Sequence, residues 1–167
     1  MTTNASVTVT TPSEREIMMT RLFDAPRNMV FDCYTKPALL RRWMFPAGWQ
    51  MTVCDNDVRA GGAFRWEWQS ADGRAMGMSG IYREVVRPER IARTEISDQD
   101  WTGGEALGTV LLAEYDGTTV VTMSVVYSSR EARDGALKSG MKDGVVASYA
   151  KLDALLASEI SRAQSAA

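Results

Sequence analysis

The chain has 167 residues, 45% of them apolar and 24% charged, which is the composition of one globular domain with its own core. Its formal net charge of −2 offers no basic surplus for binding nucleic acid, and no apolar run approaches the ~20 residues of a membrane span. Histidine is absent, which removes serine–histidine and cysteine–histidine catalysis and most zinc sites.

The N-terminal sequence MTTNASVTVTTPS is polar and rich in threonine. It lacks the basic and apolar regions of a secretory signal, so we expect residues 1–12 to form a flexible tail of a cytoplasmic protein. The two cysteines, Cys33 and Cys54, are expected to be buried thiols in a reducing compartment, with a disulfide between them as the alternative.

Residues 14–23, EREIMMTRLF, are expected to form the first strand. Two short helices should follow over roughly 26–34 and 37–44. Each begins at a proline, a residue that the first turn of a helix tolerates, and the first can also be capped by Asp24. Such a pair of helices typically buttresses one end of a sheet.

From residue 50 onward the apolar residues recur with a period of two, which indicates strands. Turns are expected at Asp72-Gly73, Arg87-Pro88 and Asp116-Gly117. Together with the first strand, this pattern predicts seven strands that are joined mostly by hairpins and are therefore mostly antiparallel.

A capping box, SSRE, at residues 128–131 begins an amphipathic segment that predicts a long helix over roughly 129–160. Three interior glycines, Gly135, Gly140 and Gly144, each cost about 1 kcal/mol against alanine and need a reason. They could allow a bend, a close approach to the sheet or room for a ligand, or they could mark an irregular start of the helix. Residues 161–167 are expected to be a flexible tail.

Four separated segments carry a family resemblance: TRLFDAPRNMVFDCYTKPALLRRWMFPAGW, DVRAGGAFRWEW, DGRAMGMSGIYREVVRPERIARTE and SSREARDGALKSGMKDGVVASYAKLDALL. In this order, over roughly residues 14–156, the sequence resembles the heat-shock-protein-90 ATPase activator homologue family of the START-like (SRPBCC, polyketide cyclase-like) superfamily. It departs from the family at Trp43-Met44, where members usually carry paired tryptophans.

The resemblance implies an α+β helix-grip fold over residues 13–160. In this fold a curved seven-stranded antiparallel sheet wraps round a long C-terminal helix, and two short helices follow the first strand. A cavity lies between the sheet and the helix. The Gly61-Gly62 pair then has a mechanical role, because glycine permits the bulge or bend that curves a strand.

Alternation places large side chains on one face of each strand, and this face should point inward. Aromatic rings and methionines suit a flat or greasy ligand, and the chain has ten methionines. The alternative is that these side chains simply fill a solid core. The residues expected to line the cavity are Trp43, Phe64, Trp66, Met78, Tyr82, Met123, Met141 and Val145.

Charged residues in the strands admit two interpretations. A carboxylate turned into the cavity, such as Glu84 or Glu95, could act as a general acid or base. We expect instead that the strand carboxylates pair with Arg65, Arg83 and Arg93 on the solvent face, because charged side chains are rarely buried. No catalytic residue is assigned, and no metal or cofactor is expected.

Three functions are compatible with this sequence. The first is binding of a hydrophobic or aromatic small molecule. The second, which the family name implies, is stimulation of a chaperone ATPase in a stress response, although the eukaryotic co-chaperone has an additional N-terminal domain for which 167 residues leave no space. The third is a cyclase or hydratase acting on a polyketide-like substrate. The protein is expected to be a monomer or a homodimer.

Overall fold

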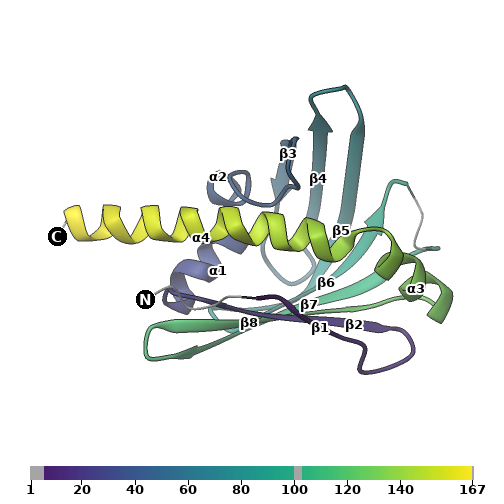
Figure 1. The fold of residues 1–167 in the computed structure, drawn as a ribbon, viewed down its shortest axis with the longest axis horizontal. Helices are drawn as coiled ribbons and strands as arrows, with labels where there is room; N and C mark the ends of the chain where they lie inside the picture. The colour runs from purple at the N-terminus through teal and green to yellow at the C-terminus, as the bar shows by residue number, and fades with distance from the viewer. Residues whose placement is uncertain (1–5, 100–102, 167) are drawn as a thin grey trace.

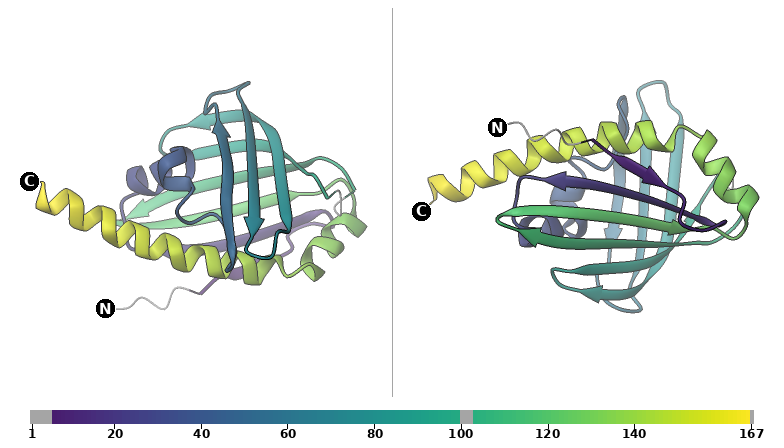
Figure 2. Two further views of the ribbon diagram at one scale, coloured as in Figure 1. Left: turned by 90° about the horizontal axis from the view of Figure 1, so that it is seen from above. Right: turned by 60° about the horizontal axis from the view of Figure 1, so that its bottom comes forward.

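An antiparallel sheet curved round one long helix dominates the computed structural model, which describes residues 6–99 and 103–166. The strand order is β1-β2-β8-β7-β6-β5-β4-β3. The sheet curls upward on the side of β3 to β5, so that helix α4 (Met141–Ser165) lies along its concave face (Figures 1 and 2). This architecture confirms the predicted α+β helix-grip fold.

The strands are β1 (Thr8–Thr10), β2 (Glu16–Phe23), β3 (Trp49–Asn56), β4 (Ala63–Ser70), β5 (Ala75–Val86), β6 (Arg90–Ser97), β7 (Ala106–Tyr115) and β8 (Thr118–Val126). The other helices are α1 (Arg27–Thr35), α2 (Pro37–Leu40) and α3 (Arg130–Lys138). Helices α1 and α2 follow the first long strand, as predicted, and lie beside α4 near the end of the molecule that holds the C-terminus (Figure 1).

The sheet has eight strands where seven were predicted. The additional strand, β1, lies in the segment expected to be a flexible tail, and it pairs with β2 with Val9 opposite Met19. Its β-branched sequence TVT favours extended backbone. The expectation of flexibility for residues 1–5 and for residue 167 lies outside the described residues.

The C-terminal segment forms two helices instead of the single helix predicted for 129–160. Helix α3 begins as expected, since the Ser129 side chain accepts a hydrogen bond of 3.0 Å from the Ala132 amide. The helix then breaks at Gly140, whose φ of +81° is left-handed and ends a right-handed helix. Of the roles considered for the glycines, Gly140 therefore provides a break. Helix α4 continues past the expected end at residue 160 to Ser165.

A cluster of packed aromatic rings closes one end of the concave face. The rings of Phe23 on β2 and Tyr149 on α4 meet edge to face at 5.0 Å, and those of Tyr34 and Trp43 meet at 4.9 Å. A partly buried ion pair adds to this attachment, because Arg21 Nη1 on β2 donates to Asp153 of α4 at 2.6 Å. Helix α4 is thus fixed against the β2 side of the sheet.

The Gly61-Gly62 pair forms the tight turn into β4, and the register shifts of the sheet lie elsewhere, at Met51/Val53 in β3 and Tyr82/Glu84 in β5. Gly61 has a φ of +85°. Gly62 approaches another backbone so closely that an added Cβ would lie 2.0 Å from the Asp57 carbonyl oxygen. The turn is tied to the shifted part of β5, since the amide of Gly61 donates to the Tyr82 carbonyl at 2.8 Å.

We predict that Gly62→Ala lowers the free energy of unfolding by about 1–3 kcal/mol, because the Cβ forces the turn to open. Gly144→Ala is the matched control, since its Cβ meets nothing within 4 Å. That control should gain up to about 1 kcal/mol from helix propensity. Urea denaturation measures both, and equal stabilities for Gly62→Ala and the native protein would show that the close approach is dispensable.

Candidate ligand cavity

One wall of the candidate site is the inner face of β4 and β5. Phe64, Trp66 and Trp68 alternate along β4 and are buried, while the residues between them are more exposed. The antiparallel register sets Met78 opposite Trp66 and Met76 opposite Trp68. Strand alternation therefore places a pair of thioethers beside a pair of indoles.

The floor is formed by β6, which carries a buried ion pair. Arg93 Nε donates to Glu95 Oε2 at 3.1 Å, and the two side chains are only 6% and 14% exposed. The guanidinium carbon of Arg93 lies 4.8 Å from the ring centroid of Trp66, so the cation stacks on the indole. Gly108 on the neighbouring strand β7 leaves room for the carboxylate, since a Cβ there would lie 2.4 Å from Glu95 Oε2.

The roof is helix α4 together with the segment between α2 and β3. Ser148 Oγ and Lys151 Nζ of α4 both donate to the Phe45 carbonyl, at 3.1 and 2.8 Å. From the other side, Trp68 Nε1 donates to the Met44 carbonyl at 2.5 Å. The segment is thus held between the helix and the sheet, and it forms one border of the space below α4.

These elements enclose a mostly apolar cavity of about 340 Å³ between the sheet and α4. Of the residues expected to line it, the structure brings together Trp43, Trp66, Met78, Met123, Met141 and Val145. Their predicted role in ligand binding stays a prediction. Gly144 also belongs to the lining, and open space lies beyond its Cα.

Phe64 and Tyr82 do not belong to this lining. Phe64 packs beneath β5, where an added Cβ at Gly80 would lie 2.7 Å from its ring. The Tyr82 hydroxyl donates to the Asn56 side-chain carbonyl, and its ring centroid lies 5.5 Å from that of Phe64. Both side chains share the inward face, as expected, but the structure places them in packed core beside the cavity.

The solvent-face interpretation is correct for some of the charged residues and wrong for others. Arg65 pairs with Glu67 and Asp98, and Glu84 pairs with Arg90, on exposed surface. Arg93 and Glu95, in contrast, line the cavity. The sequence signal that could have located them is the glycine at position 108, but its position opposite Arg93 becomes visible only once the strand register is known.

Two further tyrosines of the lining were not expected from the sequence. The hydroxyls of Tyr34 on α1 and Tyr149 on α4 lie 3.0 Å apart, and both side chains are buried. Burial raises the pKa of each phenol, because the low-polarity surroundings disfavour the charged form. Both hydroxyls therefore stay protonated and act as neutral hydrogen-bonding groups at the end of the cavity.

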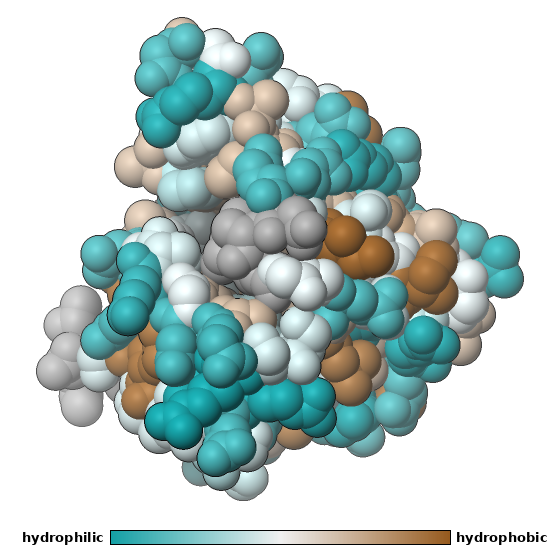
Figure 3. Space-filling view, turned by 90° about the vertical axis from the view of Figure 1, so that its right-hand side faces the viewer, coloured by the Kyte–Doolittle hydropathy of each residue, from teal (hydrophilic) through white to brown (hydrophobic). Residues whose placement is uncertain are grey.

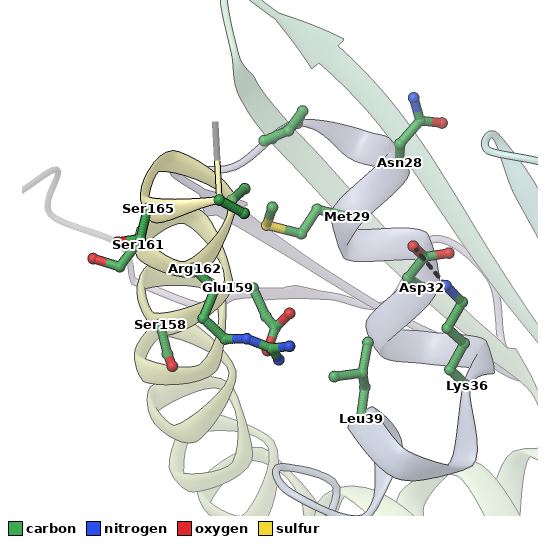
Figure 4. Close-up of a pocket in the computed structure, with 13 residues that line it drawn as sticks. Asn28, Met29, Asp32, Lys36, Leu39, Ser158, Glu159, Ser161, Arg162 and Ser165 are labelled. Atoms are coloured by element: carbon green, nitrogen blue, oxygen red, sulfur yellow. Dashed lines mark hydrogen bonds and ion pairs between the residues drawn. The ribbon is translucent and has the colours of Figure 1, made fainter.

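A larger hollow of about 950 Å³ lies between α1, α2 and the last turns of α4. It is an open groove whose polar side chains include Asp32, Lys36, Glu159 and Arg162 (Figure 4). These charges are already paired, Lys36 with Asp32 at 3.3 Å and Arg162 with Glu159 at 3.0 Å. The apolar cavity between the sheet and α4 is therefore the better candidate for a small-molecule site.

Neither a metal centre nor a membrane span emerges from residues 6–99 and 103–166. They contain no group of three or more cysteine, aspartate or glutamate side chains placed to hold a metal ion. No helix in this part of the chain is long and apolar enough to cross a bilayer.

A curved sheet that grips a C-terminal helix over an apolar cavity defines a START-like helix-grip protein. The sequence model of the family described as Activator of Hsp90 ATPase homolog 1-like protein matches residues 24–157, so the chain belongs to this family. No protein of curated function matches the sequence significantly.

Solved structures agree with this assignment. A protein from Rhodobacter sphaeroides is 33% identical, with 92% of this chain and 99% of that chain covered and a TM-score of 0.87. A protein from Chromobacterium violaceum is 27% identical, with 84% and 96% covered and a TM-score of 0.74. The AHSA1 protein from Silicibacter pomeroyi, 21% identical with 86% and 99% covered and a TM-score of 0.72, supports the fold alone.

Both cysteines are free and buried, which makes them poor nucleophiles. Burial raises the pKa of the Cys33 thiol to about 12, because desolvation disfavours the thiolate, and the pKa of Cys54 is raised for the same reason.

We predict that neither thiol of the folded protein is alkylated by iodoacetamide at pH 8 on the timescale on which the guanidinium-unfolded chain reacts completely. A raised pKa means that the reactive thiolate appears only at more alkaline pH, so the rate of alkylation should rise with pH. Mass spectrometry of each cysteine-containing peptide measures the labelling. Alkylation of the folded protein at the unfolded rate would contradict the buried placement.

Proposed function

We propose that this protein binds an apolar or aromatic small molecule reversibly in the cavity beneath α4, without covalent chemistry. The observation that carries the proposal is a partly open, mostly apolar cavity of about 340 Å³ between the sheet and α4, a size within the range of small-molecule sites. Protein interiors otherwise pack closely, so a hollow of this size is unusual in a core.

The chemistry of the lining favours a flat, apolar ligand. Trp43, Trp66 and Trp68 offer broad ring surfaces, and Met76, Met78, Met123 and Met141 offer flexible thioethers. Aromatic faces give large contact areas, and methionine adapts its shape to irregular partners. Binding would bury apolar surface of the ligand and of the cavity. This burial favours binding by a free energy of about 25 cal/mol per Å² of apolar surface removed from water.

The two other functions have less support. A chaperone-directed role in a stress response, and with it a cytoplasmic location, follows from the family description alone. The face at the α3 end of the molecule shows apolar side chains separated by hydrophilic ones instead of one continuous apolar patch (Figure 3). An enzymatic role would depend on Glu95, the carboxylate of the lining, which is held by Arg93.

A cavity-filling variant tests the proposal. Gly144 lines the cavity and faces open space, so Gly144→Phe should fill it without displacing other atoms. Binding of a hydrophobic fluorescent dye, followed by dye emission and by quenching of tryptophan fluorescence, should weaken by about tenfold or more. The melting temperature should stay close to that of the native protein.

Val146→Phe is the matched control, because Val146 lies on α4 two residues away and is 46% exposed. It adds the same ring to the same helix, and dye binding should be unchanged. Equal binding by both variants would show that the dye binds elsewhere. Loss of folding in Gly144→Phe alone would show that the space is too small for a ring and would refute a usable hollow.

A further inference from the structure

Unpartnered hydrogen-bond donors mark one part of the cavity. Among the described residues, three buried side-chain atoms have no hydrogen-bond partner: Arg21 Nε, Trp66 Nε1 and Arg93 Nη1. Trp66 and Arg93 belong to the cavity lining, and Arg21 does not. A buried donor without an acceptor is costly because it has lost its hydrogen bonds to water, and native proteins retain few of them. Two unpartnered donors in one cavity lining therefore point to an acceptor that the protein itself does not supply.

The two side chains that carry these donors are neighbours. The Arg93 guanidinium carbon lies 4.8 Å from the Trp66 ring centroid, and both residues are buried. Arg93 uses Nε for Glu95, which leaves Nη1 available. The neighbouring indole provides a contrast, since Trp68 Nε1 is already engaged by the Met44 carbonyl.

The tyrosine pair adds to this excess of donors. In the contact between the Tyr34 and Tyr149 hydroxyls, one oxygen donates and the other accepts, whichever way it is oriented. The hydroxyl that accepts keeps its own proton for another acceptor. The lining carboxylate, Glu95, accepts from Arg93 Nε through Oε2 and is bonded to neither of the unpartnered donors. The unpartnered donors of the cavity lining would therefore be satisfied by an oxygen acceptor on the ligand.

The charge balance of the site favours an uncharged acceptor over a carboxylate. Glu95 already compensates the charge of Arg93 in a site of low polarity. A carboxylate on the ligand would bring a second negative charge beside Glu95 and would lose its own hydration. A carbonyl oxygen accepts the same hydrogen bonds without adding charge.

We propose, building on the ligand-binding function above, that the cavity selects flat apolar molecules that carry an uncharged carbonyl oxygen, which accepts hydrogen bonds from Trp66 Nε1 and Arg93 Nη1. The probes are fluorene, 9-fluorenone and fluorene-9-carboxylate, which share one three-ring frame and differ in the polar group. Equilibrium dialysis against the native chain should show 9-fluorenone bound about tenfold more tightly than either of the others, since one good hydrogen bond to a desolvated donor is worth about that factor.

Two variants connect this preference to the named donors. Trp66→Phe keeps a ring in place and removes the free N–H, so the ratio of 9-fluorenone to fluorene affinity should fall severalfold toward one. Trp68→Phe is the matched control, because the N–H that it removes is already bonded to Met44. It should change both affinities alike and preserve the ratio. The paired variant Arg93→Met with Glu95→Gln removes the second donor without leaving a lone charge, and it should also reduce the ratio.

The outcomes separate this inference from the function on which it rests. Equal binding of fluorene and 9-fluorenone, lost in Gly144→Phe, would uphold ligand binding and overturn the carbonyl preference. Tighter binding of the carboxylate would overturn the choice of an uncharged ligand. A preference that survives Trp66→Phe and the paired variant would overturn the assignment of the donors. Failure of all three probes and of the dye to bind would overturn both proposals.

Discussion

The ion pair between Arg93 and Glu95 is buried inside the concave face of the sheet, and the site is organised around it. Desolvating two charges costs several kcal/mol for each ion, so the pair persists only where its surroundings compensate that cost. The compensation is visible: the Trp66 and Phe64 rings lie 4.8 and 5.6 Å from the guanidinium carbon, and Gly108 leaves room for the carboxylate. Removing either charge alone would leave the other buried without a partner.

The same constraint keeps the cavity from collapsing. A helix packed directly onto this part of β6 would have to cover the charged pair with apolar side chains, and it would remove the space in which a ligand could offer an acceptor to Arg93 Nη1. Instead, Gly144 of α4 belongs to the cavity lining, and the Ser148 and Lys151 side chains of the same helix donate hydrogen bonds to the Phe45 carbonyl in the segment between α2 and β3. Burial of this lysine also lowers the pKa of its ammonium group. The fold thus maintains a space that side chains of the chain do not fill.

Local patterns in the sequence were sufficient to predict most of the fold. Period-two alternation identified the inward faces of β4, β5 and β8, and the capping box identified the start of α3, because both depend on neighbours close in sequence. A bend at one of the three glycines was among the roles considered for them, but no feature of the neighbouring sequence shows that the helix breaks at Gly140. Strand β1 was missed because a three-residue strand is defined by its pairing with β2, which is a tertiary contact.

The site was less accessible from sequence for the same reason. Alternation put Phe64 and Trp66 on one face of β4. It could not show that Gly80 of β5 packs against the Phe64 ring, whereas the Trp66 ring borders the cavity. Arg93 and Glu95 were expected on the surface from general frequencies of buried charge. Their burial depends on Gly108 of a strand that follows more than ten residues later in the chain.

We infer that the Trp66 indole and the Arg93 guanidinium lack an acceptor within the protein and donate hydrogen bonds to a ligand. The indole ¹H–¹⁵N resonance of Trp66, assigned by comparison with Trp66→Phe, measures this directly during titration with 9-fluorenone. The account predicts a downfield shift and slowed hydrogen exchange at Trp66, with a much smaller change at Trp68, whose N–H is already bonded. Saturable binding that leaves the Trp66 indole resonance and its exchange rate unchanged would contradict it.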